Sequence, residues 1–258
     1  MKGIIFGGCS FTWGQGLYYY SDFDNLVMQN EEQFDYRFIT DAHLNYKDTI
    51  RFPRLVANHF NTIEIVKKDN GGCDYRTIDF INTILGDGEN NMKYSINEID
   101  YIIFQTSQIV RNGFDFTFNG ESYNTSKILS DKPFINWLIQ NNMTYDEWFT
   151  NYKQTVFDNI KNFLKLYEDK GIKTKILCWQ NDLLELIKND TFTSSRHVKL
   201  THSYLTYDSI SDLIDGNENM TISTDYMTFK NPILDHHPSK LCHQVIANNI
   251  IENIKNDL

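Results

Sequence analysis

The chain lacks clusters of basic side chains and long apolar runs. Its 34 Asp and Glu outnumber its 24 Lys and Arg, which leaves the 258 residues with a net charge of −10. Proteins that bind nucleic acids neutralise phosphates with Lys and Arg, so we expect no nucleic-acid partner and no polyanionic substrate. No window approaches the roughly 20 apolar residues of a membrane-spanning helix, and the first residues lack the apolar core of a signal peptide. We therefore expect a cytoplasmic protein with no membrane partner, encoded by a cell or by a virus.

Cysteine is also scarce, and the glycines form no phosphate-binding motif. The four cysteines stand at positions 9, 73, 178 and 242 without a Cys-x-x-Cys pair, a pattern that fits neither a zinc site nor a dense disulfide framework. Reduced thiols of this kind are typical of the cytosol. Neither Gly-x-Gly-x-x-Gly nor Gly-x-x-x-x-Gly-Lys-Ser/Thr occurs. We expect no cofactor and no metal.

Apolar residues are plentiful, and their spacing changes between strand-like and helix-like patterns. They make up 41% of the chain, which is enough for a sizeable core. Short apolar runs and helical periodicity predict alternating strands (4–6, 63–66, 101–104, 174–179) and helices (51–60, 77–85, 151–170, 238–257). Such alternation implies parallel strands joined by helical crossovers. The predicted fold is a single domain over 1–258, a three-layer α/β/α sandwich with a mostly parallel, flavodoxin-like sheet and insertions around 17–50, 112–150 and 181–233.

A glycine turn carrying a serine follows the first predicted strand. The apolar run Ile4–Phe6 ends in Gly7-Gly8, and Cys9-Ser10 come next. An open α/β sheet keeps its ligand crevice at the carboxyl ends of its strands, and glycines allow a tight turn there. Ser10 is therefore a candidate nucleophile, and capping of the next helix is its alternative role. Cys9 is the other candidate nucleophile, although a thiol among apolar neighbours is usually inert.

An acid and two histidines stand near the other end of the chain. Asp235-His236-His237 directly precede Pro238, which opens the last predicted helix. A loop of this kind can hold an imidazole while a carboxylate fixes its tautomer. Together with Ser10 these residues supply the hydroxyl, the base and the base-orienting acid of nucleophilic acyl transfer. The other five histidines occur singly, and we expect three of them on the surface or on a helix face: His197, His202 and His243.

These blocks together resemble the SGNH (GDSL-type) hydrolases. Residues 8–12 are similar to the first block of that family, 70–74 to its second block, and 235–239 followed by His243 to its last. The resemblance runs in order through most of the chain, and it implies the SGNH hydrolase fold. It also implies Ser10 as nucleophile, His237 as base and Asp235 as the acid that orients the base. His236, which is adjacent to Asp235, stays the alternative base.

The resemblance further implies an oxyanion hole with an unusual composition. Backbone N–H groups of Ser10 and of Gly71 or Gly72 would bind the oxyanion. The third block of the family adds an Asn amide, and in its place this chain has Gln108, with a longer amide, or the hydroxyl of Ser107. Cys9 stands where the family has Asp. Loss of one oxyanion donor costs roughly 100- to 1000-fold in rate, so a slow enzyme is one expectation.

The function implied by the resemblance is hydrolysis of a carboxylic ester through an acyl-enzyme on Ser10. The acidic composition and the aromatic-rich stretch 112–150 favour a short acyl group, such as acetyl, on a carbohydrate over a long-chain lipid. We interpret that stretch either as a satellite core or as a cap that lines a substrate cleft. The alternative function is a non-catalytic carbohydrate-binding or structural protein that retains the SGNH fold. The sequence does not indicate which oligomeric state the protein has.

Overall fold

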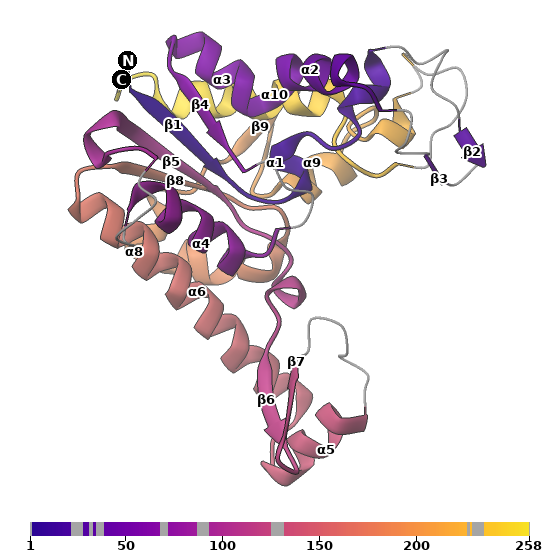
Figure 1. The fold of residues 1–258 in the computed structure, drawn as a ribbon, viewed down its shortest axis with the longest axis vertical. Helices are drawn as coiled ribbons and strands as arrows, with labels where there is room; N and C mark the ends of the chain where they lie inside the picture. Colours follow the sequence, from indigo (N-terminus) through magenta and orange to yellow (C-terminus); the bar gives the residue numbers. More distant parts are fainter. Residues whose placement is uncertain are drawn as a thin grey trace.

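Four parallel strands form the central sheet of the chain in its computed structural model (Figure 1). They lie side by side in the order β4 (Ile63–Val66), β1 (Gly3–Gly7), β5 (Ile99–Gln105) and β8 (Lys173–Leu177). The structure describes residues 2–21, 28–30, 33–34, 39–67, 72–86, 93–124, 132–225, 228 and 235–257. β4, which is the second strand of this sheet along the chain, lies on the outer side of β1, as in doubly wound sheets. The carboxyl ends of β1, β5 and β8 therefore share one edge.

Helices cover both faces of this sheet. α3 (Phe52–Phe60) and α10 (Lys240–Ile254) lie on one face, and α4 (Asp74–Leu85) and α6 (Tyr145–Asp169) lie on the other (Figure 1). Because successive strand residues point to opposite faces, Ile5 joins the core beneath α4 and α6, whereas Ile4 and Phe6 join the core beneath α3 and α10. The predicted α/β class, with a parallel sheet between two helical layers, is confirmed.

The helix boundaries differ from the predicted ones where a cap lies outside the apolar pattern. α6 begins at Tyr145, six residues before the predicted start, because Thr144 and Glu147 form a capping box. Acidic residues fill its first turn, where the helix dipole favours them. α4 begins at Asp74 for a related reason: the preceding Cys73 already has the extended backbone of an N-cap. Apolar periodicity marks the buried part of a helix and misses these polar first turns.

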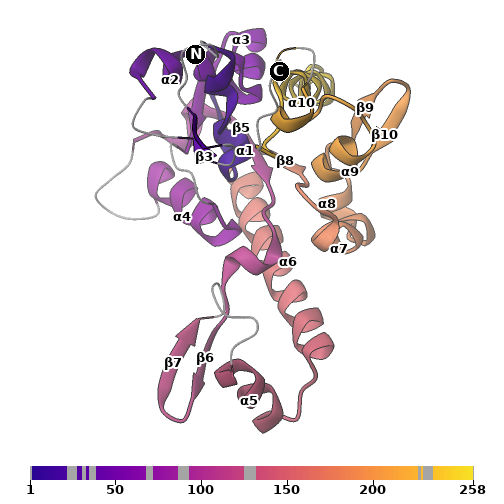
Figure 2. The same ribbon diagram turned by 90° about the vertical axis from the view of Figure 1, so that its right-hand side faces the viewer.

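The segment between β5 and β8 builds an arm. It contains η5 (Ile109–Asn112), a hairpin of β6 (Asp115–Phe118) and β7 (Glu121–Asn124), then α5 (Lys132–Gln140) and the first turns of α6. In both views the arm extends away from the sheet and from α1 (Ser10–Trp13) (Figures 1 and 2). Its rings pack on one another; Trp148 lies 4.7 Å from Phe134 and 5.2 Å from Tyr152 between centroids. The described residues of the arm form a satellite core and not a cap over α1.

Short elements complete the described chain. Those before β4 are η1 (Leu17–Tyr20), β2 (Met28–Asn30), β3 (Gln33–Phe34) and α2 (Asp41–Ile50), and η4 (Ile96–Glu98) precedes β5. Those after β8 are η7 (Asn181–Leu183), α7 (Leu184–Asn189), α8 (Thr191–Ser194), β9 (Leu200–His202), β10 (Leu205–Tyr207), α9 (Ile210–Asp215) and η8 (Ile222–Thr224). All four cysteines are free and buried. Among the helices in the described ranges, none is both long and apolar enough to cross a membrane.

Candidate active site

Ser10 lies at the carboxyl edge of the sheet. β1 ends at Gly7, and Ser10 is the first residue of α1. Its side chain is buried, with 5% exposed. As the first helical residue, Ser10 has a backbone N–H without an acceptor inside the helix. A hydroxyl and a backbone donor therefore stand together at the strand end.

The loop that precedes α10 is held against the segment around η8. Ser223 N–H donates to the Asp235 carbonyl at 2.9 Å, and Asp235 N–H donates to Ser223 Oγ at 2.7 Å. Ile222 N–H donates to the His237 carbonyl at 3.0 Å. Ser239 then caps α10 by accepting from Cys242 N–H. Backbone pairing and a helix cap thus fix both ends of the short loop that carries His237.

Ser10, His237 and Asp235 form one hydrogen-bonded chain. His237 Nε2 lies 3.2 Å from Ser10 Oγ, and His237 Nδ1 lies 2.5 Å from Asp235 Oδ1. The same Oδ1 also accepts from the His237 backbone N–H at 2.9 Å. A carboxylate at Nδ1 selects the tautomer with its proton there, which leaves Nε2 free to accept the Ser10 proton. The structure brings together the three residues that the sequence singled out.

His236 is placed differently from its neighbour. Its side chain is exposed, and it has no hydrogen bond among the described residues. His237 contacts both partners, so the geometry selects His237 from the two candidate bases.

An aromatic stack supports the imidazole. The ring of Phe11 lies 5.1 Å from that of His237, and its other neighbour Trp179 is stacked on it at 3.7 Å between centroids. Trp179 follows β8, and its backbone N–H donates to Thr106 Oγ1 beyond β5. Residues beyond three different strand ends therefore meet beside Ser10. Neither aromatic contact could be predicted from spacing along the chain.

Gly72 lies close to the turn that carries Ser10. A Cβ on Gly72 would lie 2.7 Å from the Gly8 carbonyl oxygen and 2.8 Å from Cys9 Cα, so only glycine fits there. Among the described residues, the Gly72 N–H has no acceptor. Gly71 lies outside the described residues. Of these two glycines, Gly72 is thus the one that is placed next to Ser10.

Ser107 and Gln108 differ in how their donors are used. Asp74 accepts from Ser107 N–H at 2.8 Å and from Ser107 Oγ at 3.1 Å, so both donors of Ser107 are engaged. Gln108 precedes η5, and its side-chain amide has no partner among the described residues. Of the two candidates for the role of the family's Asn, Gln108 is therefore the one whose side-chain donor is not already engaged among the described residues.

Asp74 links the start of α4 to the segment after β5 by hydrogen bonds. It is 1% exposed, and Asn112 Nδ2 donates to its carboxylate at 2.8 Å while Asn112 Oδ1 accepts from Asp74 N–H at 2.7 Å. Burial raises the pKa of Asp74 to about 6, although the hydrogen bonds from Asn112 and Ser107 oppose this shift. The sequence shows Asp74 beside the glycine turn, but nothing in it indicates a partner at Asn112.

Asp74 should make stability depend on pH. Its folded pKa of about 6 exceeds the ordinary 3.8, so the folded state binds more protons between these values. The free energy of unfolding should therefore fall by about 3 kcal/mol as pH rises through this range, relative to an Asp74→Asn variant. Urea unfolding of both proteins at several pH values measures the difference. Parallel stability curves for the two proteins would contradict the prediction.

The single histidines are more buried than expected. His243 is 0% exposed and stacks on Phe52, whose N–H donates to His243 Nδ1. Burial lowers the pKa of His243 to about 3. His197 is also buried, and its Nε2 lies 2.8 Å from the Asp208 carbonyl oxygen. His243 lies on the buried face of α10, so the helix-face alternative holds for it. The expectation was wrong for His197, which is buried outside a helix, and His202 is half-buried.

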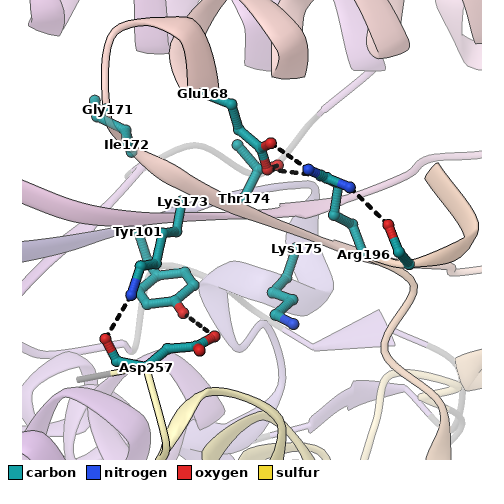
Figure 3. A pocket seen from close by; sticks show the side chains of 10 residues that line it. Tyr101, Glu168, Gly171, Ile172, Lys173, Thr174, Lys175, Arg196 and Asp257 are labelled. Carbon is teal, nitrogen blue, oxygen red and sulfur yellow. Dashed lines mark hydrogen bonds and ion pairs between the residues drawn. The ribbon is translucent and has the colours of Figure 1, made fainter. Parts of the chain in front are cut away.

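Figure 3 shows a hollow of the structure, which has a volume of about 340 Å³. It lies at the opposite end of the sheet from Ser10. Tyr101 and Lys173 line it from the amino-terminal halves of β5 and β8, whereas Ser10 follows the carboxyl end of β1. Arg196 pairs with Glu168, and Lys173 donates to the Asp257 carbonyl (Figure 3). No group of three metal-ligating side chains occurs in the described part of the chain. The triad is thus the site at which reactive side chains converge.

No family model, curated protein or solved structure matches this chain. The site therefore has to be interpreted from its own geometry. A buried hydroxyl, an imidazole with a carboxylate behind it and free N–H donors nearby form the arrangement that acyl transfer requires.

Proposed function

We propose that the chain is a divergent SGNH-type serine hydrolase that cleaves a carboxylic ester through an acyl-enzyme on Ser10. The observation that carries the proposal is the continuous hydrogen-bonded chain from Ser10 Oγ through His237 to Asp235. The parallel sheet between two helical layers and the strand-end position of Ser10 support it further.

The chemistry would proceed in two steps. His237 Nε2 accepts the Ser10 proton while Oγ attacks the ester carbonyl, and Asp235 stabilises the resulting imidazolium. The backbone N–H groups of Ser10 and Gly72, with the amide of Gln108, are the proposed donors to the oxyanion. His237 returns the proton to the leaving alcohol, and water activated by His237 then hydrolyses the acyl-enzyme.

A short acyl group on a carbohydrate remains the proposed substrate. The net charge of −10 disfavours a polyanionic substrate, and the half-buried ring of Trp179 beside the triad provides an aromatic surface of the kind that packs on sugar rings. We expect a higher kcat/KM on acetylated sugars than on medium-chain esters. The reverse order would shift the substrate to lipids.

A fluorophosphonate probe tests the nucleophile directly. The folded protein should form one covalent adduct, and mass spectrometry of the digested protein should place it on Ser10. His237→Ala should slow the labelling strongly, because the base is lost. His236→Ala, the matched control one residue away, should label at the wild-type rate.

Two outcomes would contradict the proposal. An adduct on Cys9 would assign the nucleophile to Cys9 instead of Ser10. No adduct at all on folded protein would favour the alternative, a non-catalytic binding or structural protein with this fold.

A further inference from the structure

We propose that Gln105 is a positioning residue for the nucleophile, because its side-chain amide clamps the turn and helix that carry Ser10. The inference rests on the proposed function of Ser10. It concerns a residue that the sequence patterns left without a role.

Both ends of the Gln105 amide are used. Gln105 ends β5 and is 1% exposed. Its Oε1 accepts from Thr12 Oγ1 at 2.6 Å, and its Nε2 donates to Cys9 Sγ at 3.2 Å. Cys9 precedes Ser10 and Thr12 follows it by two residues, so one amide holds α1 on both sides of the nucleophile.

The packing leaves the clamped turn no free space. A Cβ on Gly8 would lie 2.1 Å from Thr12 Oγ1 and 3.0 Å from Gln105 Cβ. Thr12 and Cys9 are themselves buried, with 3% and 2% exposed. A buried hydroxyl without a hydrogen-bond partner costs free energy. We therefore expect the side chains of Thr12 and Cys9 to shift when the Gln105 amide is removed.

The contacts of Gln105 also give Cys9 a structural role. Burial raises the pKa of the Cys9 thiol, which favours its protonated form, although the hydrogen bond from Gln105 opposes this shift. Its sulfur serves as the acceptor for Gln105. A thiol and a hydroxyl can each donate or accept, so both contacts would survive a rotation of the amide by 180°.

Displacement of α1 would change the distance between Ser10 Oγ and His237 Nε2, and so the rate of proton transfer between them. The separation of 3.2 Å between Ser10 Oγ and His237 Nε2 sits at the limit for proton transfer through a direct hydrogen bond. A misplacement of about 1 Å can cost roughly 100-fold in rate. Gln105 therefore acts through the position of Ser10 and not by touching substrate.

Gln105→Leu tests the clamp, because leucine keeps a similar volume and removes both hydrogen bonds. We expect kcat for a short-chain nitrophenyl ester to fall by about 10- to 100-fold with KM unchanged. Thr174→Val is the matched control: Thr174 is also a buried strand residue with a side-chain hydrogen bond, to Glu168, at the other end of the sheet. It should leave kcat unchanged.

A second readout does not depend on turnover. Hydrogen exchange of the backbone amides of residues 9–13 should be faster in Gln105→Leu than in Thr174→Val. Unchanged exchange in this segment, or unchanged kcat in an active protein, would overturn the inference. A wild-type protein that neither turns over ester nor labels at Ser10 would instead overturn the proposed function, and exchange would still decide whether Gln105 holds the turn.

Discussion

Ser10→Ala should lower kcat for a short-chain nitrophenyl ester by about 10⁶-fold, close to the loss expected when a triad nucleophile is removed. The substitution deletes one oxygen, whose partner in the structure is His237 Nε2. No acyl-enzyme can then form, and the remaining rate comes from binding and from the oxyanion donors. Steady-state kinetics with purified protein measures the loss.

Folding must be separated from chemistry in this experiment. Alanine is well tolerated at the first position of a helix, so the Ser10→Ala protein should unfold near the wild-type urea concentration. Ser21→Ala is the matched control, since Ser21 Oγ donates to the Tyr18 carbonyl and has no contact with the triad among the described residues. Turnover that persists in Ser10→Ala would assign the nucleophile to another residue, with Cys9 the first to examine.

The elements of the sheet could be predicted because their signals are local. The continuous apolar run at 101–104 lies inside β5, since a central strand covered on both faces needs continuous apolar residues. The alternating segment 63–66 coincides with β4, which lies at the edge of the sheet. The hairpin and α5 of the arm could not be predicted, although most of α6 was. The aromatic residues of the arm pack around Phe114 and Trp148 from several elements, so no single period of the sequence records them.

The triad could be predicted because each member stands in a recognisable local setting. Ser10 and His237 are 227 residues apart, yet one follows a glycine turn and the other directly precedes a proline just before the last helix. The residues that hold the site lack such settings. Gln105 contacts Thr12 across 93 residues and Asn112 contacts Asp74 across 38, and these pairings arise only from the order of strands in the sheet. The supporting contacts of a site therefore depend on tertiary structure even when its reactive groups do not.

Asp235→Asn should lower kcat by about 10⁴-fold while the fold persists. The amide can no longer hold the proton of His237 on Nδ1, so the tautomer with a free Nε2 facing Ser10 loses its advantage, and the imidazolium loses the charge that stabilises it. Ser223 would still hold the loop through its backbone contacts to residue 235. Steady-state kinetics at several pH values, with urea unfolding of the same samples, separates the loss of chemistry from a loss of structure.

Asp225→Asn provides the matched control for this loss. Asp225 is a buried carboxylate that follows η8 and accepts from Tyr20, with no contact to His237 among the described residues. Its replacement should change kcat by no more than a few-fold, whatever it does to stability. Equal losses in the two variants would mean that Asp235 acts only through loop structure. A much larger loss in Asp235→Asn would tie the carboxylate to the imidazole, because Asp235 Oδ1 is the atom that meets both the ring and the backbone N–H of His237.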